Sequence, residues 1–285
     1  MPRLAVLGYP VGHSRSPAMH SAALAALGMG GEWSYEAIEV APEGFAARVG
    51  EMPGEGYAGA NVTVPHKLLA LGLADSASVR AQEIGAANTL VFGPEGIHAD
   101  NTDAGGLVAS LPESPRGRSV LVLGAGGAGM AAVWALGALG AKVGIWNRTA
   151  ARAETVRIEV TERAQQFQVE IEVGVVEPEP EAEVDLDLSG FELIVNTTAV
   201  GLGGEDPFAH LPLQRDGFVP GQVVVDMVYS DAPSTLLDAA AAAGARTVDG
   251  IEILVQQGAL SFELWTGRKP PLDVMRAAAR GEQRR

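Results

Sequence analysis

Lys67 and Asp103, in the first part of the chain, are side chains whose types could take part in acid–base chemistry. Lys67 closes the sequence N-V-T-V-P-H-K, which starts at Asn61, and falls in the first turn of an expected helix, where a cation opposes the helix dipole. Asp103 closes the sequence N-T-D at the end of an expected strand. A positioned amine and carboxylate can move a proton to or from a hydroxyl. The alternatives are a surface lysine and an aspartate that only caps a helix.

Hydroxyl and amide side chains accompany this pair. Ser14 and Ser16 lie where the first strand ends and a helix begins, so that two hydroxyls and free helix N–H groups form a neutral cradle for a small carboxylate. Thr63 shares one side of a strand with Asn61, because side chains two residues apart point the same way. Asn88 stands at the start of another strand. The alternatives are a plain helix cap for the serines and a turn role for Asn88.

A glycine-rich sequence in the middle of the chain predicts a dinucleotide site. Gly124-Ala-Gly126-Gly127-Ala128-Gly129 follows a short apolar strand and opens a helix, which is the context that this fingerprint requires. The first glycine allows the tight turn, the second lets the backbone approach a pyrophosphate, and the third lets helix and strand pack closely. The helix N-terminus offers free N–H groups to the phosphates. Glycine-rich turns without a ligand also occur.

The end of the next strand indicates which dinucleotide binds. NAD-binding versions carry an acidic residue about 20 positions after the glycines, which binds the ribose 2′-hydroxyl. Here the strand runs into Asn147-Arg148-Thr149, and no carboxylate follows before Glu154. Arg148 suits a 2′-phosphate, and Arg152 can add to the same basic site. These residues predict NADP rather than NAD; the alternative is a surface arginine beside a capping threonine.

Strand and helix patterns alternate along the chain, which predicts the α/β class with mostly parallel sheets. In the first part we expect strands at 4–8, 33–40, 60–64, 88–92 and 96–99, and helices at 17–27, 43–50, 66–73, 76–85 and from about 104. Proline, glycine and polar residues at 111–118 indicate a linker. After it we expect strands at 119–124, 142–146, 170–176, 191–196 and 222–228, and helices at 127–139, 235–243, 251–265 and 271–280.

Composition excludes several classes of protein. The 20 basic and 35 acidic residues give a net charge of −15, which disfavours binding to nucleic acid or an anionic membrane. The absence of cysteine excludes disulfides, thiolate metal sites and iron–sulfur clusters. The histidines show no metal-ligand spacing, so no metal is expected. Neither a signal peptide nor a long apolar span is apparent, and a soluble, cytoplasmic protein is expected.

An acidic stretch departs from the rest of the chain. Residues 170–192 hold nine acidic and no basic residues. A cation site or an acidic docking surface is one interpretation, and a solvated strand edge and loop is the favoured one.

In order and over nearly the whole chain, these motifs resemble those of the shikimate dehydrogenase family. The N-terminal motifs are P-V-G-H-S-R-S-P from Pro10, N-V-T-V-P-H-K from Asn61, G-A-A-N-T-L from Gly85 and N-T-D-A-G-G from Asn101. The glycine-rich loop and N-R-T follow. The last are D-M-V-Y from Asp226, G-I-E-I-L-V-Q-Q-G from Gly250 and F-E-L-W-T-G from Phe262.

The resemblance implies a fold and an activity. It implies a Rossmann-type NADP-binding domain at 111–250 and a mostly parallel α/β substrate domain at 1–110, which the helices at 251–285 complete, with a cleft between the two. The implied reaction is the NADP-dependent interconversion of 3-dehydroshikimate and shikimate, a step toward chorismate and the aromatic amino acids.

The resemblance also implies roles for residues. The acid–base pair maps onto Lys67 and Asp103, and the substrate carboxylate onto Ser14 and Ser16. Further contacts to the carboxylate or ring hydroxyls map onto Thr63, Asn88, Tyr229 and Gln257. Contacts to the cofactor map onto the glycine-rich loop (Gly124, Gly126, Gly127 and Ala128), onto Asn147, Arg148, Thr149 and Arg152, and onto Met227 and Gly250 beside the nicotinamide.

Some residues depart from the family pattern, and alternatives remain. Ser21, Ala99 and Ile253 stand where the family often has asparagine, glycine and methionine. An enzyme that also accepts quinate or NAD is one alternative, and an NADP-binding sensor without activity is another. Retention of both Lys67 and Asp103 argues against the sensor. A homodimer stays open, because these residues do not decide the oligomeric state.

Overall fold

The computed structural model describes residues 1–177, 185–229 and 233–282. The chain forms two compact units: unit 1 comprises Met1–Ala109 and Leu254–Arg285, and unit 2 comprises Ser110–Ile253. The chain therefore passes from one unit to the other twice, each time within a helix. The predicted assignment of substrate to one domain and cofactor to the other stays a proposal.

Unit 1 contains a six-stranded sheet and the helices around it. Its elements are β1 (Arg3–Gly8), α1 (Ser16–Ala26), β2 (Ser34–Glu39), η1 (Pro42–Gly44), α2 (Phe45–Glu51), η2 (Met52–Glu55), β3 (Tyr57–Val62), α3 (Lys67–Gly72), β4 (Ser76–Ala77), α4 (Val79–Ile84), β5 (Thr89–Gly93), β6 (Gly96–Asp100), α5 (Thr102–Ser110), α9 (Gly250–Thr266) and α10 (Leu272–Ala279). The strand order is β2-β1-β3-β5-β6-β4.

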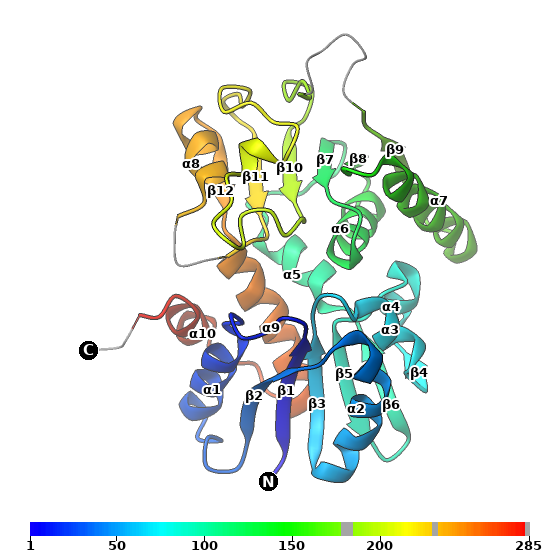
Figure 1. The fold of residues 1–285 in the computed structure, drawn as a ribbon, viewed down its shortest axis with the longest axis vertical. Coiled ribbons are helices and arrows are strands. Elements are labelled where there is room, and N and C mark those ends of the chain that lie inside the picture. The colour runs from blue at the N-terminus through cyan, green and yellow to red at the C-terminus, as the bar shows by residue number, and fades with distance from the viewer. Residues whose placement is uncertain (178–184, 230–232, 283–285) are drawn as a thin grey trace. The chain divides into compact units, whose positions relative to one another are not determined.

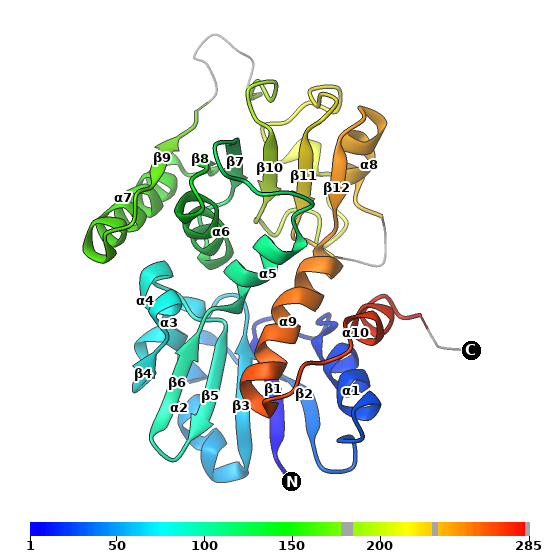
Figure 2. The ribbon, with the colours of Figure 1, turned by 180° about the vertical axis from the view of Figure 1, so that it is seen from behind.

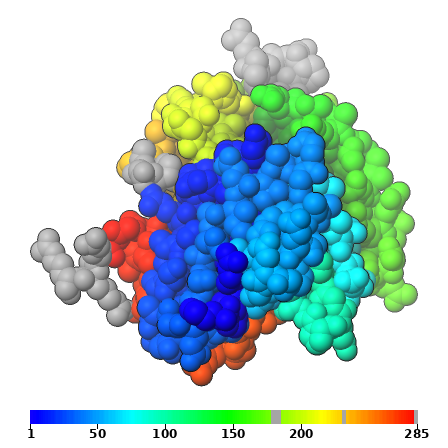
Figure 3. All heavy atoms as spheres, turned by 60° about the horizontal axis from the view of Figure 1, so that its bottom comes forward, coloured from blue at the N-terminus to red at the C-terminus, as the bar shows by residue number. Residues whose placement is uncertain are grey.

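The two faces of this sheet are covered by different helices (Figures 1 and 2). Side chains alternate along β1, so that Ala5 and Leu7 face a core that includes Phe45 of α2. Leu4 and Val6 face the opposite way, into a core that includes Trp265 of α9. The first residues of the chain lie at the surface of unit 1, dark blue in Figure 3, where Met1 is exposed. Burial on both faces explains the continuous apolar run of β1.

One strand of unit 1 runs against its neighbours. β5 is antiparallel to both β3 and β6, and the other pairs are parallel. Only two residues separate Gly93 from Gly96, which pair across the β5–β6 hairpin, and Gly96 has a positive φ of 105°. A connection this short joins antiparallel strands, whereas a parallel pair needs a crossover of a dozen or more residues. The sheet is therefore mostly parallel, as predicted.

Unit 2 is built on a second six-stranded sheet, whose pairs are all parallel. Its elements are β7 (Ser119–Leu123), α6 (Gly127–Ala138), β8 (Lys142–Trp146), α7 (Ala150–Phe167), β9 (Glu172–Val175), β10 (Leu193–Asn196), η3 (Pro207–Ala209), β11 (Val223–Asp226), α8 (Thr235–Ala242) and β12 (Arg246–Val248). The strand order is β12-β11-β10-β7-β8-β9.

Helices cover both faces of the unit 2 sheet. α6 and α7 contact β7, β8 and β9, and α8 contacts β11 and β12. Leu121 and Leu123 share a core with Leu236 of α8, which assigns α8 to the face opposite the buried Val120 and Val122. This doubly wound arrangement confirms the predicted α/β fold with a Rossmann-type half.

Three features of the elements differ from the prediction. α7 has 18 residues and is the longest helix of the described chain, yet the sequence patterns yielded no helix there beyond a cap at Thr149. The expected helix at 76–85 is the short strand β4 followed by α4, and the short strand β12 was not expected.

The acidic stretch is only partly described, because residues 178–184, including Pro178 and Pro180, lie outside the described chain. Its first part contains the edge strand β9, and farther on Leu186 and Leu188 are buried in the core under α8. Among the described residues, no helix has the length and apolarity needed to cross a membrane.

Candidate active site

Most of the residues predicted to bind substrate lie at one edge of the unit 1 sheet. β1, β3 and β6 run in the same direction and end at this edge, and the antiparallel β5 begins there. The chain at these ends carries the predicted residues: Ser14 and Ser16 after β1, Thr63 and Lys67 after β3, Asn88 before β5 and Asp103 after β6. Strand direction thus gathers residues that are far apart in sequence.

Lys67 and Asp103 form an ion pair at this edge. The Lys67 Nζ atom lies 2.7 Å from Asp103 Oδ2, and the two side chains are only 12% and 9% exposed. Lys67 is the first residue of α3, and Asp103 lies in the first turn of α5. Partial exclusion of water strengthens the attraction between the charges, and leaving either one alone there would be costly. The pair is therefore a charged, ordered group with limited access to solvent.

Asn88 holds the second oxygen of Asp103. The Asn88 side chain accepts a hydrogen bond from the backbone N–H of Thr102 at 2.7 Å. An N–H group can only donate, so this contact fixes the Asn88 oxygen on that side and turns its NH₂ group toward Asp103. Asn88 Nδ2 then donates to Asp103 Oδ1 at 2.8 Å. The carboxylate accepts from a different donor through each oxygen.

Gln257 belongs to the same cluster. It lies on α9, and its Oε1 atom is 3.2 Å from both Asn88 Nδ2 and Thr102 Oγ1, while its Nε2 donates to the carbonyl of Leu254. Gln257 can reach Asn88 because α9 packs closely on α5. Gly106 allows this close packing, since a Cβ at residue 106 would overlap the Gln257 backbone. The structure thus brings four predicted residues together: Lys67, Asn88, Asp103 and Gln257.

The two serines lie at the start of α1. The Ser14 hydroxyl accepts a hydrogen bond from the Ser16 backbone N–H at 3.3 Å, and Ser16 is buried. α1 begins at Ser16, one residue before the expected start at 17, so its cap position is Arg15. Thr63 packs against Gly8 at the ends of β3 and β1, where any Cβ at residue 8 would overlap the threonine methyl group.

The glycine-rich loop has the backbone that the fingerprint requires. Gly124 has a positive φ of 112°, and a Cβ at Gly129 would overlap the carbonyl group of Gly124. A Cβ at Gly126 would meet no atom within 4 Å. α6 begins at Gly127 and has no side-chain cap, so its first N–H groups remain available to a ligand. This geometry fits a pyrophosphate.

Asn147 and Thr149 connect this loop to the end of β8. Asn147 Oδ1 accepts from the Ala125 N–H at 3.2 Å, and Asn147 Nδ2 donates to the Thr149 carbonyl at 3.0 Å. Thr149 is the N-cap residue of α7, but its hydroxyl makes no cap hydrogen bond. The amide of Asn147 therefore holds the shape of the loop.

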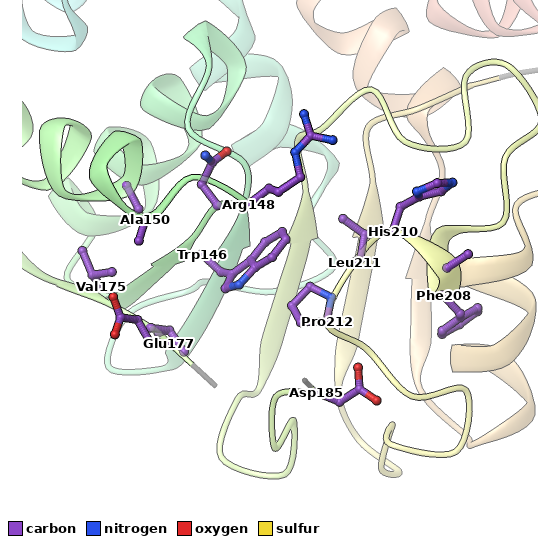
Figure 4. Close-up of a pocket in the computed structure, with 14 residues that line it drawn as sticks. Trp146, Arg148, Ala150, Val175, Glu177, Asp185, Phe208, His210, Leu211 and Pro212 are labelled. Atoms are coloured by element: carbon purple, nitrogen blue, oxygen red, sulfur yellow. The ribbon is translucent and has the colours of Figure 1, made fainter. Parts of the chain in front are cut away.

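Arg148 lines a cavity of about 560 Å³ in unit 2. Figure 4 shows its guanidinium at one end of this cavity, the indole ring of Trp146 in the middle, and the carboxylates of Glu177 and Asp185 at the other end. Within the described part of the chain, Arg148 makes no ion pair. Arg152 is exposed in the first turn of α7. A guanidinium that has no ion pair among the described residues and lies beside the phosphate loop fits a 2′-phosphate. The carboxylates at the far end of the cavity would repel a phosphate, so the arginine end is the one that suits it.

Met227 and Gly250 lie together in unit 2. Both follow strands of its sheet, and a Cβ at Gly250 would come within 2.7 Å of the Met227 carbonyl oxygen. Glycine is required there because backbone occupies the space of a side chain. Tyr229 is half-buried in the same segment after β11. Tyr229 thus belongs to unit 2, whereas the other predicted substrate residues belong to unit 1.

Comparison with known sequences decides the family. The model of the shikimate dehydrogenase substrate binding domain matches residues 6–90, and that of the shikimate 5'-dehydrogenase C-terminal domain matches residues 250–280. The alanine dehydrogenase/PNT C-terminal domain matches residues 95–230. A shikimate dehydrogenase (NADP(+)) from Methanocella arvoryzae is 41% identical, with 96% of this chain and 97% of that protein covered. The chain belongs to the shikimate dehydrogenase family.

Solved structures of the family have the same fold. The shikimate 5-dehydrogenase of Thermus thermophilus, in complex with NADP(H) and shikimate, is 37% identical with a TM-score of 0.81, over 99% of this chain and all of that one (100%). The shikimate dehydrogenase of Aquifex aeolicus is 35% identical with a TM-score of 0.84, over 98% of each chain.

Sequence reasoning missed several residues that contact the shikimate dehydrogenase motifs. Thr102, inside the N-T-D motif, bonds Asn88 and Gln257. Ser261, one helical turn after Gln257, and Tyr35, on β2, join the same cluster. The spacing of four between Gln257 and Ser261, which puts both on one face of a helix, was the available signal. For Tyr35 the sequence held none.

Proposed function

We propose that this chain is an NADP-dependent shikimate dehydrogenase, which interconverts 3-dehydroshikimate and shikimate. The observation that carries the proposal is the sheltered Lys67–Asp103 pair, 2.7 Å apart, with Asn88 bound to the other oxygen of Asp103. A catalytically silent sensor has no use for such a pair. Membership of the family supplies the substrate and the cofactor.

The edge of the unit 1 sheet suits a small polyhydroxylated carboxylate. Ser14 and Ser16 offer hydroxyls and helix N–H groups to the carboxylate without adding a charge. Thr63, Asn88 and Gln257 offer groups that both donate and accept, as ring hydroxyls require. Tyr229, in unit 2, carries a hydroxyl of the same kind. In this assignment the neutral groups hold the substrate and the charged pair lies at the reacting hydroxyl.

The proton is handled at Lys67 Nζ. When bound, NADPH supplies the hydride to the substrate carbonyl carbon, and NADP⁺ accepts it in the reverse direction. In reduction, the Lys67 ammonium donates a proton to the carbonyl oxygen, which becomes the hydroxyl. In oxidation, the Lys67 amine takes that proton. Asp103 keeps the amine in place through its Oδ2 atom.

The residues of unit 2 fit NADP. The glycine-rich loop and the start of α6 would hold the pyrophosphate, and Arg148, with Arg152 near it, would hold the 2′-phosphate. Met227 and Gly250 would border the nicotinamide. Asn147, and Thr149 through its carbonyl, would act by fixing the loop.

A spectrophotometric assay tests the proposal. The purified protein is mixed with shikimate and NADP⁺, and the absorbance of reduced nicotinamide is followed. We expect turnover with this pair and a much lower kcat/KM with quinate or with NAD⁺. Turnover that is equal with quinate would assign a broader quinate/shikimate enzyme. Tight NADPH binding without turnover on any of these substrates would assign a sensor and refute the proposal.

A further inference from the structure

A continuous network of buried hydrogen bonds leads from β2 to the Lys67–Asp103 pair. The Tyr35 hydroxyl donates to Asn61 Oδ1 at 2.8 Å, and Asn61 Nδ2 donates to the Ser261 hydroxyl at 2.9 Å. Ser261 Oγ shares a hydrogen bond of 3.0 Å with Thr102 Oγ1. The Thr102 hydroxyl accepts from Asn88 Nδ2 at 3.0 Å, and Asn88 Nδ2 also donates to Asp103. All of these residues belong to unit 1.

Ser261 is the junction of this network. Its hydroxyl lies within hydrogen-bond distance of three side chains that come from three different strands or helices: Asn61 at 2.9 Å, Thr89 at 2.9 Å and Thr102 at 3.0 Å. Ser261 itself is completely buried on α9. A single hydroxyl therefore joins β3, β5 and α5 beneath the proposed active site.

The amide groups of the network each have a fixed orientation. Asn61 Nδ2 also faces the Asn88 carbonyl, which can only accept, so the Asn61 amide cannot turn round. Ser261 accepts from Asn61, and its own proton can go to the Gln257 carbonyl one turn back on α9, at 3.1 Å, or to the hydroxyl of Thr89 or Thr102. Thr89 donates to Asn88 Oδ1 at 3.1 Å and so accepts on its other side. The Asn88 amide keeps the orientation that the Thr102 backbone N–H gives it, and the hydroxyls of Ser261, Thr89 and Thr102 fill the space behind it with mutual hydrogen bonds.

Stability alone does not explain so many polar groups in a core. Buried amides and hydroxyls give up their hydrogen bonds to water, and apolar side chains of similar shape often serve a core equally well. A fully satisfied network instead gives rigidity and a unique arrangement. This network ends at the carboxylate that holds the acid–base lysine, where a misplacement of about 1 Å can cost up to ~100-fold in rate.

We propose that Ser261 is a positioning residue for the Lys67–Asp103 pair. Its hydroxyl orients Thr102 and Asn88, and through them it sets the position of the Asp103 carboxylate. The inference rests on the proposed function. Turnover of shikimate by the parent protein tests that function separately, and only the ratio of variant to parent tests Ser261.

The experiment compares Ser261→Ala with a matched variant of the same helix. Thr266→Val also removes a hydroxyl from α9, one that donates to the Phe262 carbonyl at 2.7 Å and takes no part in the network. We expect Ser261→Ala to lower kcat by roughly tenfold, with KM for shikimate and NADP⁺ within about twofold of the parent. Thr266→Val should keep the parent kcat. An unchanged kcat for Ser261→Ala, or an equal loss in both variants, overturns the proposal.

Two further variants separate positioning from a general loss of structure. Thr102→Val removes the other hydroxyl of the same hydrogen bond from a side chain of the same shape, and should reproduce the loss of kcat. It also decides the question if Ser261→Ala does not fold. Ser261→Thr keeps the hydroxyl and should retain most of the activity. Loss of kcat in Ser261→Thr equal to that in Ser261→Ala, at similar melting temperatures, would contradict the proposal.

A double-mutant cycle identifies the group through which Ser261 acts. In a Lys67→Ala background, the addition of Ser261→Ala should lower the residual kcat by less than about twofold, because the pair it positions is already broken. A full tenfold loss in that background would show that Ser261 serves some other part of the site, and would overturn the assignment.

Discussion

At the scale of single residues, the site depends on neighbours that give each group one task. Asp103 accepts from Lys67 through one oxygen and from Asn88 through the other. The carboxylate cannot rotate without breaking one of these bonds, so the ammonium is held in a fixed direction. The serines at α1 carry no charge and leave the pair as the charged group among the substrate residues proposed in unit 1. Charge is thus concentrated where the proton must move.

Replacement of Lys67 tests the acid–base assignment. We expect Lys67→Ala to lower kcat by ~100-fold or more, which is the range for losing a positioned acid–base group, with a smaller effect on KM for shikimate. Lys269→Ala is the matched control, because Lys269 is an exposed lysine beyond the end of α9. Steady-state kinetics on both variants provides the measurement, and a Lys67→Ala enzyme with the parent kcat would remove Lys67 from the chemistry.

Arg148 decides the choice of cofactor. A guanidinium makes charge-assisted hydrogen bonds to a phosphate, which contribute about 1.5–3 kcal/mol each, and NAD⁺ has only a hydroxyl at that position. Arg148→Ala should therefore raise KM for NADP⁺ by roughly tenfold or more and leave KM for NAD⁺ nearly unchanged. Steady-state kinetics of the variant with NADP⁺ and with NAD⁺ provides the measurement, and NAD⁺ serves as the control. Equal damage to both would make Arg148 a structural residue of the loop.

The sequence predicted the proposed reacting groups better than the buried residues that hold them in place. Lys67, Asp103 and the N-R-T sequence stand in local motifs whose chemistry is visible without a fold. Ser261 and Tyr35 lie 200 and 26 positions from Asn61, the residue that they share. Such partners are chosen by tertiary packing. The spacing of four places Ser261 on the same helix face as Gln257, but no local pattern names Asn61 as its partner.

At the scale of elements, the start of α6 combines two different demands on glycine. Gly129 is required by packing, because a Cβ there would overlap the carbonyl of Gly124. Gly126 is not, since a Cβ would meet no protein atom within 4 Å and its φ is negative (−94°). The open space beside Gly126 is where a pyrophosphate would approach the backbone.

This contrast can be tested with two alanine variants. Gly129→Ala should destabilise unit 2 by about 1–3 kcal/mol, the usual cost of overpacking, and lower the midpoint of guanidinium unfolding. Gly126→Ala should leave that midpoint nearly unchanged but raise KM for NADP⁺, because its methyl group takes the space of the ligand. If both variants lose stability equally, Gly126 also has a packing role and the argument from open space is wrong.

Most helices and strands could be predicted from apolar periodicity and from the positions of glycine and proline, and the exceptions have physical reasons. The buried side chains of α7 form a narrow stripe of small residues at helical spacing: Ala153, Val156, Val160 and Ala164. Most other residues of α7 are polar, so the apolar periodicity is weak in the sequence. Its exposed side carries Glu–Arg pairs three or four residues apart, such as Glu154–Arg157 and Glu159–Arg163. β4 and β12 have only two and three residues, too few for a pattern of alternation.

At the scale of the whole molecule, a net charge of −15 must coexist with an anionic substrate and an anionic cofactor. The residues of the proposed sites compensate locally for the negative net charge. Neutral hydroxyls and helix N–H groups face the proposed carboxylate, and an arginine without an ion pair, among the described residues, faces the proposed 2′-phosphate. Local contacts outweigh a distant excess charge, because salt screens interactions beyond about 8–10 Å under ordinary conditions.

The core of unit 1 also contains a histidine that ties the stability of the folded chain to pH. His20 is fully buried, its ring nitrogens have no hydrogen-bond partner among the described residues, and it stacks on Tyr35 with ring centroids 4.3 Å apart. Burial lowers the pKa of His20 from 6.5 to about 3, because the charged ring would lose its hydration without compensation. The neutral form is therefore the one that fits the core.

The sign of the effect follows from this lowered pKa. Below pH 6.5 the unfolded chain binds a proton at His20 that the folded chain refuses, so the contribution of His20 to stability is complete above pH 6.5 and is lost progressively toward pH 3. At pH 4.5 the loss from this residue should be about 2–3 kcal/mol, at 1.36 kcal/mol per pH unit.

His20→Phe keeps a ring in the stack and removes the titrating group. Guanidinium unfolding of both proteins at pH 7.5 and 4.5 measures the difference, in which the carboxylates common to both cancel. We expect the parent to lose about 2–3 kcal/mol more than His20→Phe between these two values, and no divergence between pH 7 and 8. Parallel pH dependences down to pH 4.5 would mean that His20 gains a proton in the folded core, and that the stack with Tyr35 tolerates a charge.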